Sequence, residues 1–73
     1  MSIRILVVDD HELLREGLKS LLSREEDMEV VGEAAGGHEA IALARNLRPD
    51  VVVLDARLPD VDGVEVCRQL QEE

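Results

Sequence analysis

Hydrophobic residues are concentrated in three short runs along this chain. The first run is Ile3–Val8, which only Arg4 interrupts; the second and weaker run is Val30–Ala35, and the third is Val51–Leu54. Continuous apolar runs, as opposed to alternating ones, are typical of strands that are buried on both faces of a parallel sheet. The pattern therefore predicts three parallel strands.

The segments that follow these runs carry apolar residues at helical spacing. The predicted apolar stripes are Leu13, Leu14, Gly17, Leu18, Leu21 and Leu22 in the first segment, Ala40, Ile41, Ala44 and Leu47 in the second, and Val64, Cys67 and Leu70 in the third. Arg15, Glu16 and Lys19 are predicted to lie on the opposite, polar side of the first helix. One helix is thus expected after each strand.

Two of these helices also carry end signals. Pro49 should close the second helix, with Arg45 and Arg48 near the negative end of its dipole. Asp62 and Gly63 should start the third helix. These signals give the expected end of the second helix and the expected start of the third.

Strands that alternate with helices of this length predict βαβ units with right-handed crossovers. We expect a flavodoxin-like α/β fold, in which a parallel sheet carries helices on both faces. In that order residues 3–8 and 51–54 form neighbouring strands, and function collects at the carboxyl ends of such strands.

Charge and composition exclude several classes of protein. Seventeen acidic against eight basic residues give a formal net charge of −9, which disfavours direct binding of DNA or of an anionic membrane. There are no aromatic residues, so the core must be aliphatic. Cys67 is the only cysteine, and there is neither a signal pattern nor an apolar run of about 20 residues. A soluble, cytoplasmic protein is expected.

Acidic residues stand at the ends of the two strands that should be neighbours. Asp9 and Asp10 follow Val8, and Asp55 follows Leu54. Three carboxylates in one small volume repel each other unless a cation neutralises them. Mg²⁺ accepts a few carboxylate oxygens, keeps several waters and bridges to phosphate, and a carboxylate beside it can accept a phosphoryl group covalently.

Simpler roles for these acids stay open at this point. Asp10 also stands where the N-cap of the first helix belongs, and an isolated Asp55 would be an ordinary polar loop residue. Asp60 and Asp62 are predicted to be turn and cap residues. The functional interpretation depends on the paired acids and Asp55 being brought together.

Three segments together resemble the receiver domain of bacterial response regulators, in the NarL/FixJ-like branch whose output is a LuxR-type helix-turn-helix. They are residues 7–11 (Val-Val-Asp-Asp-His), 14–18 (Leu-Arg-Glu-Gly-Leu) and 54–63 (Leu-Asp-Ala-Arg-Leu-Pro-Asp-Val-Asp-Gly). The resemblance covers essentially the whole chain. Its small departures are Leu58, where the family often has Met, and Gly36, where it often has Asp or Asn.

The resemblance implies a role for four residues. Asp55 would accept the phosphoryl group, Asp10 would bind Mg²⁺ directly, Asp9 would assist through water, and the backbone carbonyl of Arg57 would complete the metal shell. The implied function is a phosphate-accepting signalling module, not an enzyme beyond its own phosphotransfer and slow aspartyl-phosphate hydrolysis. Its partners would be a sensor histidine kinase and, through an output domain outside this chain, DNA.

The resemblance also predicts that residues 1–73 form a partial receiver domain. A family receiver has five strand–helix units, of which three are expected here, and the units that carry its switch Ser or Thr and its phosphate-binding Lys are missing. The chain has no threonine, and its single lysine, Lys19, lies in the first helix. With strand 51–54 left as a sheet edge, self-association as a homodimer or by exchange of elements is expected.

Other sites fit the residues less well. An aspartyl-nucleophile phosphohydrolase needs an acid where Arg57 stands, a cobalamin site needs glycine in place of Leu14, and Leu58 and Pro59 interrupt a calcium loop. Zinc binding by His11, His38 and Cys67 lacks ligand spacing. The remaining alternative is a receiver-like interaction module that dimerises without accepting phosphate.

Overall fold

The computed structural model describes residues 2–55 and 57–71 of the 73-residue chain. Ala56 in the segment 54–63, and both extreme ends of the predicted domain 1–73, lie outside these residues. Strands and helices alternate in the order β1 (Ile3–Val8), α1 (Glu12–Ser23), β2 (Met28–Ala34), α2 (Gly37–Leu47), β3 (Val51–Leu54) and α3 (Gly63–Gln71). The six predicted elements are all present.

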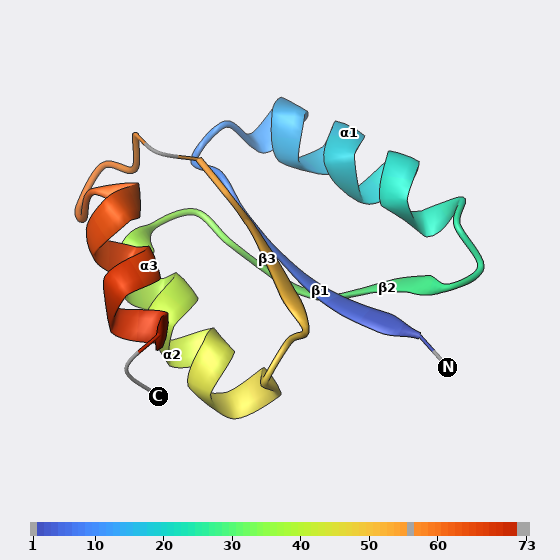
Figure 1. Ribbon diagram of the computed structural model, residues 1–73. Coiled ribbons are helices and arrows are strands. Elements are labelled where there is room, and N and C mark those ends of the chain that lie inside the picture. The colour runs from blue at the N-terminus through green and yellow to red at the C-terminus, as the bar shows by residue number, and fades with distance from the viewer. Residues whose placement is uncertain (1, 56, 72–73) are drawn as a thin grey trace.

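The three strands form one parallel sheet in the order β2-β1-β3. Val8 at the end of β1 is level with Ala34 on one side and with Leu54 on the other, so all three strands end at the same edge. Helix α1 lies on one face of the sheet, and α2 and α3 lie on the other (Figure 1). The predicted flavodoxin-like arrangement, with β1 and β3 as neighbours, is confirmed.

The best-packed core lies between the sheet and the helices α2 and α3. Its buried members are Leu6, Val8, Ala34, Ala40, Ile41 and Val66. Ile5 and Val7 point to the opposite face, toward α1, because successive side chains of a strand alternate, and they are also buried. Burial of each large aliphatic side chain contributes about 1.5–3 kcal/mol, so β1 is the centre of the fold.

Helix α1 meets the sheet with a different face from the one predicted. Three leucines of the predicted stripe are exposed to solvent: Leu13, Leu14 and Leu21. Leu18 and Leu22 are half-buried, whereas Arg15 and Lys19, predicted on the polar side, bind Glu33 of β2. These four α1 residues share one side of a helix. The prediction was wrong here because β2 presents the carboxylate of Glu33 toward α1, and the two cations of this helix pair with it.

The predicted stripe of α3 was also wrong. Val64 and Cys67 are exposed, and Val66 is the fully buried side chain of this helix. The reason is the close approach of α3 to the start of α2: a Cβ atom placed on Gly37 would lie 2.9 Å from Val66 Cγ2. Leu70 is half-buried against the same core, as predicted.

The end of α2 follows its signals. Arg48 has the left-handed conformation, with a φ of 50°, and donates its backbone N–H to the Ala44 carbonyl. Pro49 comes next and cannot continue the helix. Arg4 of β1 donates from its guanidinium to the carbonyl oxygens of Leu47 and Arg48, so the last free carbonyls of α2 are satisfied by the neighbouring strand.

Candidate functional site

The hydrogen bonds of the sheet continue one residue past the ends of β1 and β3. The backbone N–H of Asp9 donates to the Ala34 carbonyl at 3.0 Å, and the N–H of Asp55 donates to the Val8 carbonyl at 3.0 Å. Asp9 and Asp55 are therefore held beside each other by the backbone of the sheet itself. Their positions follow from strand register and do not depend on loop conformation.

One cluster of possible metal ligands lies at this edge. Asp9, Asp10, His11 and Asp55 each offer a ligand atom, and these atoms lie within 4.8 Å of one another. Asp9 is buried, Asp55 is half-buried, and Asp10 and His11 are exposed. The structure thus brings together the three carboxylates that the sequence predicted to converge. Their oxygen ligands and open position suit a hard, largely hydrated cation such as Mg²⁺.

His11 belongs to this cluster, although the sequence analysis considered it only as a zinc ligand that lacks suitable spacing. Its Nδ1 atom lies 2.9 Å from Asp9 Oδ1, 3.1 Å from Asp10 Oδ1 and 3.9 Å from Asp55 Oδ2. The hydrogen bond with Asp9 is the main cause that raises the pKa of His11, and the charges of Asp10 and Asp9 act in the same direction. Its position directly after two acidic residues was the signal that could have placed it here.

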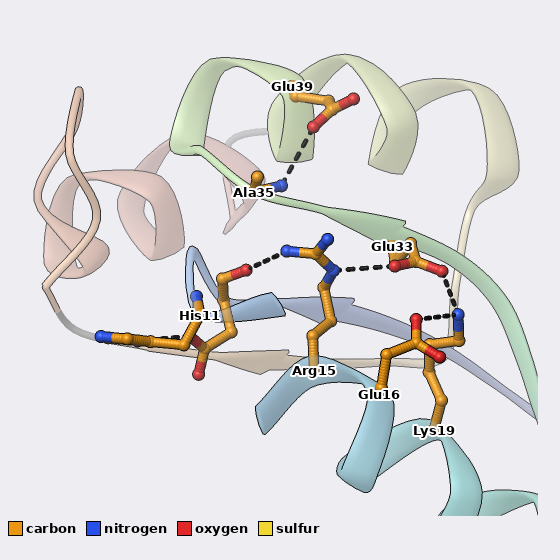
Figure 2. Close-up of polar contacts among 8 residues, drawn as sticks. His11, Arg15, Glu16, Lys19, Glu33, Ala35 and Glu39 are labelled. Atoms are coloured by element: carbon orange, nitrogen blue, oxygen red, sulfur yellow. Dashed lines mark hydrogen bonds and ion pairs between the residues drawn. The ribbon is translucent and has the colours of Figure 1, made fainter. Parts of the chain in front are cut away.

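Asp9 is the buried acid of the cluster. Its Oδ1 accepts the backbone N–H of His11 at 2.8 Å and the ring Nδ1 at 2.9 Å (Figure 2 shows the ring bond). The backbone hydrogen bond lowers the pKa of Asp9, and burial, which acts in the opposite direction, does not cancel this effect. Asp9 is therefore ionised at neutral pH.

The capping role considered for Asp10 is wrong. The N-cap of α1 is His11, whose backbone is extended and whose side chain caps nothing. The carboxylate of Asp9 binds the N–H of His11 and so keeps this residue out of the helix. Asp10 consequently stands one position ahead of the cap and contributes its carboxylate to the cluster.

The loop after β3 places three further predicted residues. The backbone N–H of Arg57 donates to Asp55 Oδ1 at 3.0 Å, so Arg57 lies beside the Asp55 carboxylate. Asp62 Oδ1 accepts the N–H of Val64 at 2.8 Å and caps α3, as predicted. Asp60 is also a cap, but for the start of α2, where it accepts the N–H groups of Gly37 and His38.

Arg15 of α1 binds the backbone of Asp9 and so contacts the cluster on its α1 side, which the sequence did not predict. Its Nη1 atom donates to the backbone carbonyl of Asp9 at 2.7 Å, and its Nε atom donates to Glu33 Oε1 at 2.7 Å. Figure 2 shows the guanidinium between these two acceptors. Helix α1 is thereby fixed both to the end of β1 and to β2.

Comparison with known proteins identifies the family of this chain. The family model described as the response regulator receiver domain matches residues 5–73. This chain belongs to that family. The curated response regulator protein VraR of Staphylococcus aureus is 49% identical over 73 residues, which are 100% of this chain and 35% of VraR.

Solved receiver structures share the fold. The response regulator domain of Thermotoga maritima CheB has a TM-score of 0.96 and 39% identity, over 99% of this chain and 54% of that one. The signal receiver domain of Mycobacterium tuberculosis NarL has a TM-score of 0.94 and 41% identity, over 97% and 57%. The present chain therefore spans about a third of the curated relative and a little over half of these structures.

The geometry also bears on the other sites considered for this receiver. Among residues 2–55 and 57–71 the metal-ligand cluster includes His11 but neither His38 nor Cys67, so the three possible zinc ligands are not brought together. Lys19 is paired with Glu16 and Glu33 and is directed away from the acidic cluster (Figure 2). No helix in the described part of the chain is both long and apolar enough to span a membrane.

Proposed function

We propose that this chain is the phosphate-accepting receiver module of a two-component response regulator, with Asp55 as the phosphoacceptor. The observation that carries the proposal is the position of Asp55, whose N–H is bonded to Val8 and whose carboxylate shares one cluster with Asp9 and Asp10. A half-buried carboxylate at the carboxyl edge of a parallel sheet is accessible to a phosphodonor while its backbone remains fixed.

The same residues fit Mg²⁺. Asp10 and Asp55 would provide direct carboxylate ligands, Asp9 would act through water, and the backbone carbonyl of Arg57 would complete the protein's share of the shell. When bound, the cation neutralises the acids and the charge that develops on the transferred phosphoryl oxygens. The hydrogen bonds from the Arg57 N–H to Asp55 and from the His11 N–H to Asp9 restrain two of these carboxylates beforehand.

Asp55 performs the chemical step in this proposal. A carboxylate oxygen of Asp55 attacks the phosphorus of a phosphohistidine on a sensor histidine kinase. The new O–P bond forms as the P–N bond breaks, and the electron pair stays on the imidazole nitrogen, which takes a proton from solvent. The protein positions the acceptor and stabilises charge, which is most of what phosphoryl transfer requires.

In the longer protein, we infer, the chain is the first part of a cytoplasmic receiver that controls a helix-turn-helix output. The net charge of −9 makes this segment itself unsuited to DNA, so contact with DNA would be made by the output domain. The further receiver units would supply the switch hydroxyl and the phosphate-binding lysine.

A second function has a specific observation in its favour. β3 pairs only with β1 among the described strands, and its four residues are all apolar. Such an edge favours association with another chain. The alternative is therefore an interaction module that dimerises and does not accept phosphate.

Incubation with acetyl phosphate and Mg²⁺, followed by intact mass spectrometry, separates the two functions. We expect a gain of one phosphoryl group that is absent in Asp55→Asn. Asp27→Asn is the matched control, because Asp27 is an exposed turn residue far from the cluster. If the unmodified chain and its longer parent gain nothing, or if Asp55→Asn is still labelled, the assignment is wrong.

A further inference from the structure

Helix α2 begins without a side-chain cap of its own. Its N-cap residue is Gly36, which has no side chain to accept the first backbone N–H groups. An N-terminus of a helix leaves several such donors unpaired, and a Ser, Thr, Asp or Asn at the N-cap normally binds one of them. Glu39, in the first turn, accepts the N–H of Ala35, which precedes the helix (Figure 2). The donors of the helix itself therefore need another partner.

Asp60 supplies that partner from the loop after β3. Its Oδ1 accepts the N–H of Gly37 at 2.7 Å, and its Oδ2 accepts the N–H of His38 at 3.1 Å. These two bonds lower the pKa of Asp60, because they stabilise its ionised form at the positive end of the helix dipole. Both oxygens of the carboxylate are used, so the loop is held in one orientation.

The Asp60 carboxylate occupies the place that a cap side chain at position 36 would take. A Cβ atom on Gly36 would lie 3.1 Å from Asp60 Oδ1 and 3.2 Å from Oδ2. Next to it, a Cβ on Gly37 would lie only 2.8 Å from Val61 Cβ. The two glycines thus allow the loop to approach the backbone of α2: a side chain at position 37 would displace Val61, and one at position 36 would crowd the Asp60 carboxylate.

We propose that Asp60 is a positioning residue for the loop after the phosphoacceptor: it caps α2 from a distance and thereby fixes the segment 57–60, in which the Arg57 N–H binds the Asp55 carboxylate. The part of this inference that concerns Mg²⁺ rests on the proposed function, and the part that concerns the loop does not. On sequence grounds Asp60 was only a turn or cap residue. The structure gives it a connection to α2 that the sequence did not indicate.

Amide hydrogen exchange measured by NMR tests the loop without metal or phosphate. In Asp60→Ala the amides of Gly37 and His38 should exchange about tenfold faster, the effect of losing a hydrogen bond to a charged group. The amide of Arg57, bonded to Asp55, should also lose protection. Glu26→Ala removes one exposed acid from a distant turn and should change none of these rates. Unchanged protection of Gly37 and His38 in Asp60→Ala overturns the proposal.

A rescue variant separates positioning of the loop from simple capping. In Gly36→Asn combined with Asp60→Ala, the new side chain enters the space that Asp60 leaves and caps α2 locally. The protection of the α2 amides and the thermal stability should return to the values of the unmodified chain. The Arg57 amide should still exchange fast. If protection of the Arg57 amide also returns, Asp60 acts only as a cap of α2 and does not position the loop. Asp60→Asn, which keeps the acceptor Oδ1, should lie between the unmodified chain and Asp60→Ala and guards against a variant that fails to fold.

Titration with MgCl₂ adds the functional readout. Affinity should fall several-fold in Asp60→Ala and remain low in the double variant, because the Arg57 carbonyl is no longer held. If the unmodified chain and Asp60→Ala bind Mg²⁺ with equal affinity, Asp60 does not position the Arg57 carbonyl for the metal. If even the unmodified chain binds no Mg²⁺, the proposed function fails, while the exchange rates of Gly37, His38 and Arg57 still decide whether Asp60 holds the loop.

Discussion

Arg15 and Glu33 form an ion pair between α1 and β2, with 2.7 Å between Nε and Oε1. Lys19, one turn further along α1, binds the other oxygen of the same carboxylate. Both cations lower the pKa of Glu33, and Lys19 has the larger effect. Glu33 of β2 therefore attaches α1 to the sheet through two ion pairs, whereas the sequence predicted that only the leucine stripe of this helix would contact the sheet.

The first prediction concerns acid stability. Because the folded-state pKa of Glu33 lies below its ordinary value of 4.5, this group stabilises the fold above the ordinary pKa, and the contribution is lost as pH falls through the folded-state pKa. Lys19→Met should flatten the loss of stability below about pH 4.5, whereas Lys19→Arg, which keeps the charge, should not. Thermal unfolding followed from pH 3 to pH 7 (roughly the range of carboxylate titration) measures this. The same acid-side slope in all three proteins would contradict it.

The second prediction ranks the acids around His11. Asp9 contributes most to the raised pKa of His11, and Asp55 contributes least among the three acids. Asp9→Asn should therefore lower the titration midpoint of the His11 ring more than Asp10→Asn, and Asp55→Asn should lower it least. The ring resonances of His11 in NMR spectra give the midpoints. A reversed order would mean that the ring does not lie between Asp9 and Asp10.

The third prediction concerns Mg²⁺ itself. Titration should first shift the backbone amides of Asp10, Asp55 and Arg57, and binding should be weak because the open cluster leaves the ion largely hydrated. In Asp55→Asn these local shifts should be reduced. Asp27→Asn serves as the control with the same loss of charge. Shifts spread evenly over all acidic residues would indicate a diffuse negative field with no site.

The fourth prediction compares two valines of α3. Val66 is fully buried against α2 and Val64 is 74% exposed. Val66→Ala should lower the free energy of unfolding by about 2 kcal/mol, from lost burial and the space left behind. Val64→Ala should change it by less than about 0.5 kcal/mol. Urea unfolding at one fixed chain concentration gives both differences, because the stability of an associating chain depends on its concentration. Equal losses would restore the stripe that spacing alone predicted.

These comparisons separate what the sequence could predict from what it could not. The strands and the converging acids were predicted correctly because each follows from a local run, and strand register then places Asp9 beside Asp55. The buried faces of α1 and α3 were not predicted correctly, because apolar residues spaced by three or four positions are compatible with more than one buried face of a helix. The choice depends on distant partners, Glu33 for α1 and Gly37 for α3.

The same limit applies to the polar contacts of the site. His11 was adjacent to the acids in sequence, and the hydrogen bond between its ring Nδ1 and Asp9 Oδ1 holds the ring in the cluster. The cap that Asp60 gives to α2 joins residues 23 positions apart. Nothing in the segment around Asp60 encodes this distant pair, so it becomes visible only once the loop is placed.

The last prediction concerns the free edge of β3. One side of this strand is paired with β1, and among the described residues no strand lies on its other side. Its sequence, Val51–Leu54, has no lysine or proline that would prevent another chain from pairing with it. We expect the isolated chain to associate through this edge instead of persisting as a compact monomer.

Size-exclusion chromatography with light scattering tests the edge directly. Val51→Lys places a charge on a half-exposed edge position and should shift the chain toward the monomer, because a charged edge resists pairing. Leu21→Lys places the same charge on an exposed position of α1, which packs on β1 and β2, and should leave association unchanged. A monodisperse, cooperatively unfolding monomer of 8.1 kDa for the unmodified chain would contradict the prediction. It would mean that three βα units bury enough aliphatic surface to be stable without a neighbour for β3.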